Sequence, residues 1–164
     1  MTNKILKIFS ALLLSVWLVG MYRAKFGQDT LAQAAPDVIV LGTDAEHPPY
    51  SFMENGQVVG FDVDLFSAVA TRIGKKRIVK KLSPDQLMPQ LSDEMVHAIA
   101  QETVTELDGK AFLVSHPYLE QNAQHFFVLS RNNEAFLALL NNALDEIKED
   151  GTLVALQKKW NLIS

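Results

Sequence analysis

The stretch that decides the fold is residues 38–74, VIVLGTDAEHPPYSFMENGQVVGFDVDLFSAVATRIG. Its continuous apolar opening, Val38–Leu41, is typical of a strand buried on both faces of a sheet, and Gly42 is expected to end that strand. The Asn55–Gly56 pair between two short apolar arms predicts a β-hairpin. From Phe61 to Gly74 the apolar residues fall on one helical stripe. A strand, a hairpin and a helix in this order indicate an α/β fold.

Further strands and helices follow in alternation along the chain. The expected strands are Arg77–Leu82, Val96–Ala100, Ala111–Ser115 and Gln124–Leu129, and the expected helices are Pro84–Leu91, Asn133–Gly151 and a final amphipathic segment, Leu153–Trp160. Such alternation predicts one α/β lobe of three layers around a mostly parallel sheet.

The first residues predict export from the cytoplasm. Lys4 and Lys7 precede an apolar run without charges, and a small-x-small site ends at Ala34, so residues 1–34 are typical of a signal peptide and residues 35–164 form the expected domain. An uncleaved membrane anchor over residues 5–21 is the alternative. Either reading places the domain in the periplasm or elsewhere outside the cytoplasm.

Composition excludes several classes of protein. The 164 residues are 48% hydrophobic and contain no cysteine, which excludes disulfide scaffolds and thiolate metal sites. Without the four basic and one acidic residues of 1–34, the domain has 11 basic and 18 acidic residues, a net charge of −7, which disfavours nucleic acid as a partner. The only basic cluster, at residues 72–81, is interpreted as a solvated helix end and edge strand, with a docking patch as the alternative.

Three stretches in order carry a resemblance to a known family. They are Gly42–Phe52 with Gly60–Leu65, Leu87–Leu91 with Thr103–Thr105 and Ser115–Tyr118, and Leu137–Trp160. The chain thereby resembles the polar-amino-acid class of bacterial extracytoplasmic solute-binding proteins, the ligand-capture subunits of ABC importers. The resemblance implies a periplasmic-binding-protein-like fold whose members have two lobes. Because Phe126–Ser130 runs directly into the C-terminal helices, the chain resembles the first lobe alone, with the second lobe missing.

The resemblance also implies a ligand site. It assigns solute contacts to Asp44, His47, Thr103 and Thr105, while Asp108 stands where the family has an arginine that clamps the ligand carboxylate. A carboxylate at that position repels what a guanidinium would bind through two hydrogen bonds. The expectation is therefore weakened or altered recognition of amino acids.

Each candidate also has a purely structural explanation. Asp44 can cap its loop, the two aromatic residues that follow can pack under the hairpin, and the two threonines suit a strand end and a helix N-cap with Asp108 in the first turn. Asp62 with Asp64 is interpreted as a helix start. The candidate ligand-binding residues are Asp44, His47, Tyr50, Phe52, Thr103, Thr105 and Asp108.

No pattern in the chain indicates catalysis, a metal site or a cofactor. The function expected is capture of a small polar, amino-acid-like solute in association with an ABC permease, with two copies pairing across the cleft edge as a further option. The alternative is a non-binding interaction module that docks an envelope protein through the exposed cleft face.

Overall fold

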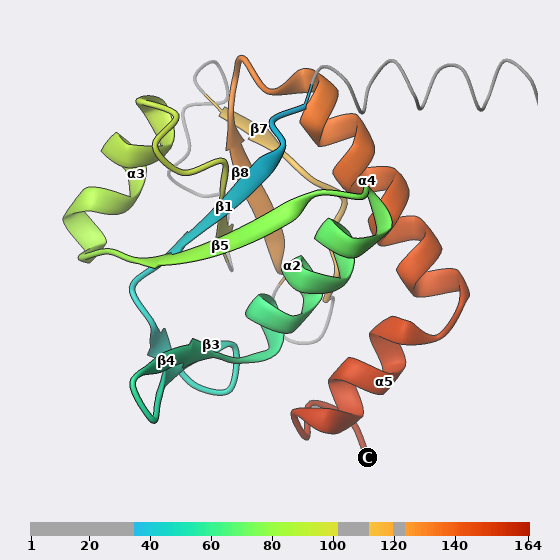
Figure 1. The fold of residues 1–164 in the computed structure, drawn as a ribbon. Helices are drawn as coiled ribbons and strands as arrows, with labels where there is room; N and C mark the ends of the chain where they lie inside the picture. Colours follow the sequence, from blue (N-terminus) through green and yellow to red (C-terminus); the bar gives the residue numbers. More distant parts are fainter. Residues whose placement is uncertain (1–34, 102–111, 120–123) are drawn as a thin grey trace, which may run out of the picture.

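The computed structural model describes residues 35–101, 112–119 and 124–164, and its centre is a five-stranded sheet (Figure 1). The strands are β1 (Val38–Thr43), β5 (Lys76–Lys81), β6 (Ala98–Gln101), β7 (Phe112–Val114) and β8 (Phe126–Ser130), in the order β5-β1-β6-β8-β7. β1 pairs in parallel with β5 and β6, whereas β8 is antiparallel to both of its neighbours. The α/β lobe is confirmed, and its sheet is mixed. β8 reverses because the connection from β7 is too short for a helical crossover.

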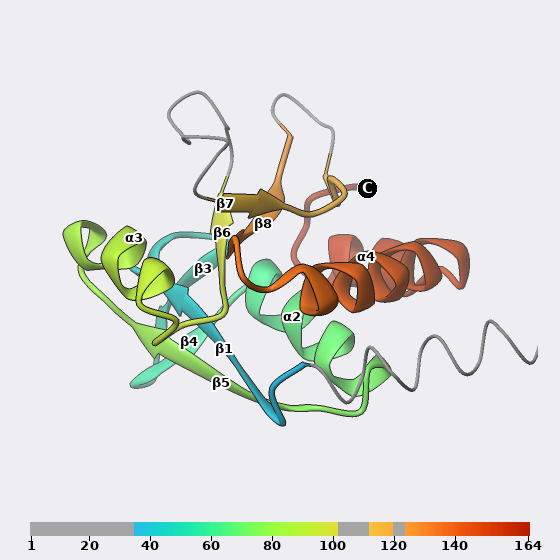
Figure 2. The same cartoon turned by 90° about the horizontal axis from the view of Figure 1, so that it is seen from above.

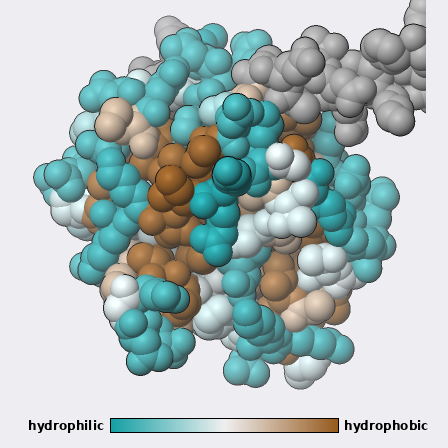
Figure 3. All heavy atoms as spheres, in the orientation of Figure 1, coloured by the Kyte–Doolittle hydropathy of each residue, from teal (hydrophilic) through white to brown (hydrophobic). Residues whose placement is uncertain are grey.

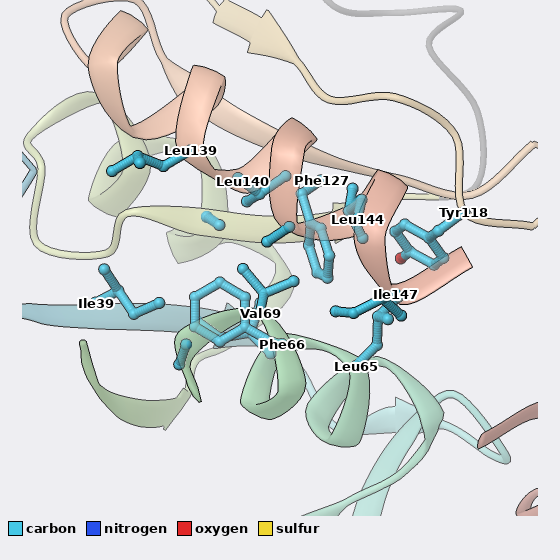
Figure 4. Packing of buried hydrophobic residues seen from close by; sticks show 14 of the residues in the cluster. Ile39, Leu65, Phe66, Val69, Tyr118, Phe127, Leu139, Leu140, Leu144 and Ile147 are labelled. Atoms are coloured by element: carbon cyan, nitrogen blue, oxygen red, sulfur yellow. The ribbon is translucent and has the colours of Figure 1, made fainter. Parts of the chain in front are cut away.

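Helices cover both faces of the sheet and make the three expected layers (Figure 2). On one face lie α2 (Phe61–Arg72), α4 (Glu134–Glu149) and α5 (Thr152–Lys159), and on the other lies α3 (Pro84–Ser92). The larger core fills the α2 and α4 side, where Phe66 and Phe127 are fully buried with ring centroids 5.6 Å apart (Figure 4). The smaller core joins Leu91 to Ile99 and Val128. All five residues of β8 are buried because it lies between these two cores.

The hairpin forms as predicted from β3 (Ser51–Glu54) and β4 (Gln57–Val59). Asn55 and Gly56 have φ angles of 50° and 79°, which suits a tight hairpin turn. β2 (Glu46–His47) adds a third strand, which the sequence did not predict because two residues in a proline-rich loop show no periodicity. The Pro48–Pro49 peptide bond is cis.

The predicted end of the first strand is wrong. Gly42 was expected to end the first strand, but β1 continues through Thr43. A Cβ on Gly42 would lie 3.2 Å from side-chain carbons of Val96 and Ile99, so the absence of a side chain lets the strand pass close to the α3 side of the core.

The predicted signal peptide or anchor lies outside the described residues. Within the described ranges, no helix has the length and apolar character needed to cross a bilayer.

Candidate functional site

A cavity of about 500 Å³ opens at the carboxyl end of β1. The chain passes from β1 through α2 to β5 on one side and then through α3 to β6 on the other side, so the strand order switches direction at β1. Ligands of open α/β sheets bind beyond the strand ends at such a switch point. The cavity is lined by Gly42, Thr43, Asp44, Glu46, His47, Pro48, Tyr50, Ser51, Asp62, Leu87, Ala100 and His125.

Asp44 both caps its loop and lines this cavity. Its Oδ1 accepts a hydrogen bond from the Glu46 N–H at 3.2 Å, and its Oδ2 lies 3.0 Å from His47 Nε2. Only 12% of the Asp44 side chain is exposed, against 69% for His47. The carboxylate is therefore held in one position at the cavity wall, while the imidazole remains accessible to solvent.

Two hydroxyl groups fix the loop that carries Asp44. Thr43 Oγ1 lies 2.7 Å from Ser51 Oγ and accepts a hydrogen bond from the Ala45 N–H at 3.0 Å. Ala45 takes a left-handed φ of 56°, which the Thr43 hydrogen bond helps to stabilise. The first wall of the cavity is thus preorganised by contacts between β1 and β3.

The two aromatic candidates lie in different places. Tyr50 lines the cavity, and its ring centroid is 4.5 Å from that of the buried His125. Phe52 does not line the cavity and packs edge-on against Trp160 at 5.9 Å. The remaining three candidates, Thr103, Thr105 and Asp108, lie outside the described residues.

Asp62, which the sequence predicts only as part of a helix start, lines the cavity. It is 4% exposed, its backbone N–H donates to Tyr50 O at 2.9 Å, and its Oδ1 accepts a hydrogen bond from Tyr118 Oη at 3.0 Å. Its position on the buried stripe of α2, three residues before Leu65, was the signal that it points inward.

Burial changes the acid–base behaviour of this pair. Burial raises the pKa of Asp62 to about 7, against the opposing effects of the Tyr118 hydrogen bond and the His47 charge. Burial, followed by the charge of Asp62, raises the pKa of Tyr118 well above its usual value. The cavity wall therefore contains a carboxyl group that titrates near neutral pH.

Acidic side chains outnumber basic ones in the cavity lining. Asp44, Glu46 and Asp62 line it together with two histidines, and no lysine or arginine does so among the described residues. Because the raised pKa keeps a proton on Asp62 below about pH 7, Asp44 and Glu46 supply the negative charge. Carboxylates beside an aromatic ring favour a cationic group. In the part of the chain that the structure describes, no three histidine, aspartate or glutamate side chains gather where they could hold a metal ion.

Comparison with known proteins places residues 39–163 within the family model of bacterial extracellular solute-binding proteins, family 3. The probable ABC transporter arginine-binding protein ArtJ of Chlamydia trachomatis is 32% identical over 92 residues, covering 55% of this chain and 35% of that protein. The putative ABC transporter arginine-binding protein 2 of Escherichia coli is 32% identical over 96 residues, covering 57% and 40%. The match spans well under half the length of these relatives.

Solved structures show the same lobe. The arginine-bound form of domain 1 from TmArgBP superposes with a TM-score of 0.62 at 28% identity, covering 67% of this chain and 93% of that domain. The arginine-, lysine-, histidine-binding protein ArtJ from Geobacillus stearothermophilus gives 0.68 at 17% identity, covering 74% of this chain and 94% of the other, which supports the fold alone.

Proposed function

The chain belongs to family 3 of the bacterial extracellular solute-binding proteins, and from this premise we propose that its lobe captures a cationic amino acid or a related organic cation outside the cytoplasm for an ABC importer. The family is one of extracellular solute-binding proteins, which is a binding function and not an enzymatic one. The observation that carries the choice of ligand is the acidic cavity at the end of β1. Relatives named for arginine binding support it.

Two groups would hold the cationic end of such a ligand. Asp44 offers a carboxylate that hydrogen bonds already hold in place. Ligand binding would therefore cost little additional conformational entropy at this residue. Tyr50 lines the same cavity and supplies an aromatic ring for a guanidinium or ammonium group. His47, at the exposed rim, contributes a hydrogen-bonding group near the opening.

The carboxylate end of an amino acid would meet the second group of candidates. In this proposal Thr103 and Thr105 provide hydroxyl groups, and Asp108 opposes the ligand carboxylate. Recognition then depends on the cationic end, and affinity for ordinary amino acids is lower than in relatives that have an arginine there. One lobe offers an open wall, so a second copy or an envelope partner that covers the cavity would strengthen binding.

Calorimetry on the whole chain tests the proposal with arginine, lysine, agmatine and glutamate. We expect heat of binding from the three cations and none from glutamate. Asp44→Asn should weaken cation binding by about tenfold, because a charge-assisted contact is lost. Glu54→Gln makes the same charge change on the exposed hairpin and should leave binding unchanged. Glutamate binding, or equal binding by the Asp44 variant, would contradict the proposal.

The alternative function is a non-binding interaction module that docks an envelope protein. The acid at position 108 favours it, because it opposes the carboxylate that all amino acids carry. A folded chain that binds none of the four ligands at millimolar concentration would favour this alternative.

A further inference from the structure

The strand β5 forms an open edge of the sheet. β1 is its only strand neighbour among the described residues. The Lys76 N–H donates to Asp37 O at 3.1 Å, and the Leu82 N–H donates to Thr43 O at 2.8 Å, so the even-numbered backbone groups face β1. Because backbone groups alternate along a strand, those of Arg77, Val79 and Lys81 face away from β1. Such an edge can accept another strand.

A groove of about 490 Å³ runs beside this edge. It is bordered by β5 and by the β3–β4 hairpin, and its lining residues are Met53, Gly56, Gln57, Val58, Arg77, Ile78, Val79 and Lys81. Ile78 is 52% exposed and Met53 is 41% exposed, which is high for large apolar side chains. β5 and the hairpin lie on the face drawn in Figure 3, where hydrophobic surface borders hydrophilic surface. The groove therefore offers both apolar and polar contacts to a bound chain.

Half of the basic side chains of residues 72–81 make no hydrogen bond or ion pair with a described residue. Arg72 pairs with Glu146 and Asp150. Lys75 and Lys80 are bonded to Asp37 and Gln90, respectively. The side chains that make no hydrogen bond or ion pair with a described residue are those of Lys76, Arg77 and Lys81. Two of these three lie on the groove.

We propose that the open edge of β5 and its groove bind an extended acidic segment of a partner protein by strand addition. Arg77 and Lys81 lie on the same face of β5, about 13 Å apart, with Val79 between them. A paired strand that matches this face has acidic residues at positions i and i+4 and an apolar residue at i+2. A second copy of this chain paired through β5 would oppose like charges and is disfavoured.

Two synthetic peptides of equal composition test the proposal by fluorescence anisotropy on the whole chain. Thr-Glu-Thr-Val-Thr-Glu-Thr has the matching spacing, and Thr-Glu-Glu-Thr-Thr-Val-Thr does not. We expect the first to bind at least about tenfold more tightly. Charge reversal by Arg77→Glu with Lys81→Glu should remove this preference. Lys76→Glu changes the same strand on its other face and should retain it.

The backbone contribution is tested separately. Val79→Pro removes an N–H that faces the open edge without removing a hydrogen bond to β1, so it should weaken peptide binding. Thermal melting checks that this variant folds, and the charge-reversed variant decides the matter if it does not. Equal binding of the two peptides, or no binding of either, would overturn the proposal. The basic residues of β5 would then serve only to prevent aggregation through the open edge. Binding to phosphatidylglycerol vesicles in place of the peptide would equally overturn the proposal.

Discussion

At the scale of single residues, the Asp62–Tyr118 pair joins the core to the cavity. The carboxyl group is buried at the start of α2, and the phenol that donates to it belongs to the segment after β7. Burial of an acid is unfavourable in its charged form, which is why the pKa of Asp62 rises to about 7. In the folded protein the Asp62 carboxyl group therefore keeps its proton at pH values at which the unfolded chain has already lost it.

We predict that Asp62 makes stability depend on pH. Between about pH 4 and pH 7 the native state holds a proton that the unfolded state has lost, so stability should fall as pH rises through this range. The effect is on the order of a few kcal/mol. Urea unfolding across this range should show a flatter profile for Asp62→Asn than for the unchanged chain. Asp85→Asn, an exposed control, should keep the original slope; equal slopes for all three would contradict the prediction.

A second residue-scale prediction concerns position 108. If this acid opposes the ligand carboxylate, Asp108→Arg should increase the affinity for arginine by about tenfold or more, because an attractive contact replaces a repulsive one. Agmatine lacks the carboxylate and should gain nothing. The ratio of the two affinities, measured by calorimetry, separates this effect from a general change in charge. An unchanged ratio would show that this loop does not meet the ligand.

At the scale of elements, the connection from the hairpin into α2 positions the cavity. Gly60 has a φ of 139°, and a Cβ there would lie 2.1 Å from Tyr50 O. The same carbonyl accepts the Asp62 N–H, so hairpin, cavity and helix meet at this turn.

Gly60→Ala should therefore disturb both stability and binding. The added Cβ must displace the Tyr50 backbone, and the left-handed conformation disfavours alanine, so we expect a loss of about 1–3 kcal/mol in unfolding free energy. Denaturant unfolding and cation calorimetry measure the two effects. Gly56→Ala also has a positive φ but meets no atom within 4 Å, so it should cost less and leave binding unchanged. Equal losses from both variants would contradict the role of the close contact.

The helices and strands were largely predictable from the sequence, whereas the contacts between distant parts of the chain were not. The helix over 61–72 and the hairpin follow from periodicity and turn residues, which are local signals. The reversed direction of β8 follows from its short connection to β7 only once the two strands are known to pair, and that pairing was not predicted. The Asp44 site could be expected from the family resemblance, but the pairing of Asp62 with Tyr118 joins residues 56 positions apart and needed the tertiary structure.

At the scale of the whole molecule, the C-terminal residues contact both α2 and the β3–β4 hairpin. Trp160 Nε1 and Lys159 Nζ each donate to Asp64 Oδ2 at 2.7 Å, and the Trp160 ring packs against Phe52. The C-terminal residues thereby hold the hairpin against α2. The helix α4 of the same C-terminal region buries Leu140 and Ile147 in the main core.

Loss of the Trp160 contacts should destabilise the hairpin more than the rest of the lobe. Trp160→Ala should cost roughly 1–3 kcal/mol in unfolding free energy. Hydrogen exchange should speed up in β3 and β4 more than in β1 or β8. Trp160→Phe keeps ring packing and loses only the hydrogen bond to Asp64, so its effect should be smaller. Uniform acceleration across the sheet would show that α5 stabilises the lobe as a whole.

The bridge between Leu119 and His125 has a practical consequence. The Tyr118 N–H donates to His125 O at 2.8 Å, and the His125 N–H donates to Leu119 O at 3.0 Å, so Leu119 and His125 are held side by side. A foreign domain inserted between these two residues would begin and end at neighbouring points, so its insertion should not distort the sheet. His125 borders the acidic cavity, so a fluorescent protein inserted between Leu119 and His125 would report ligand binding as a change in fluorescence.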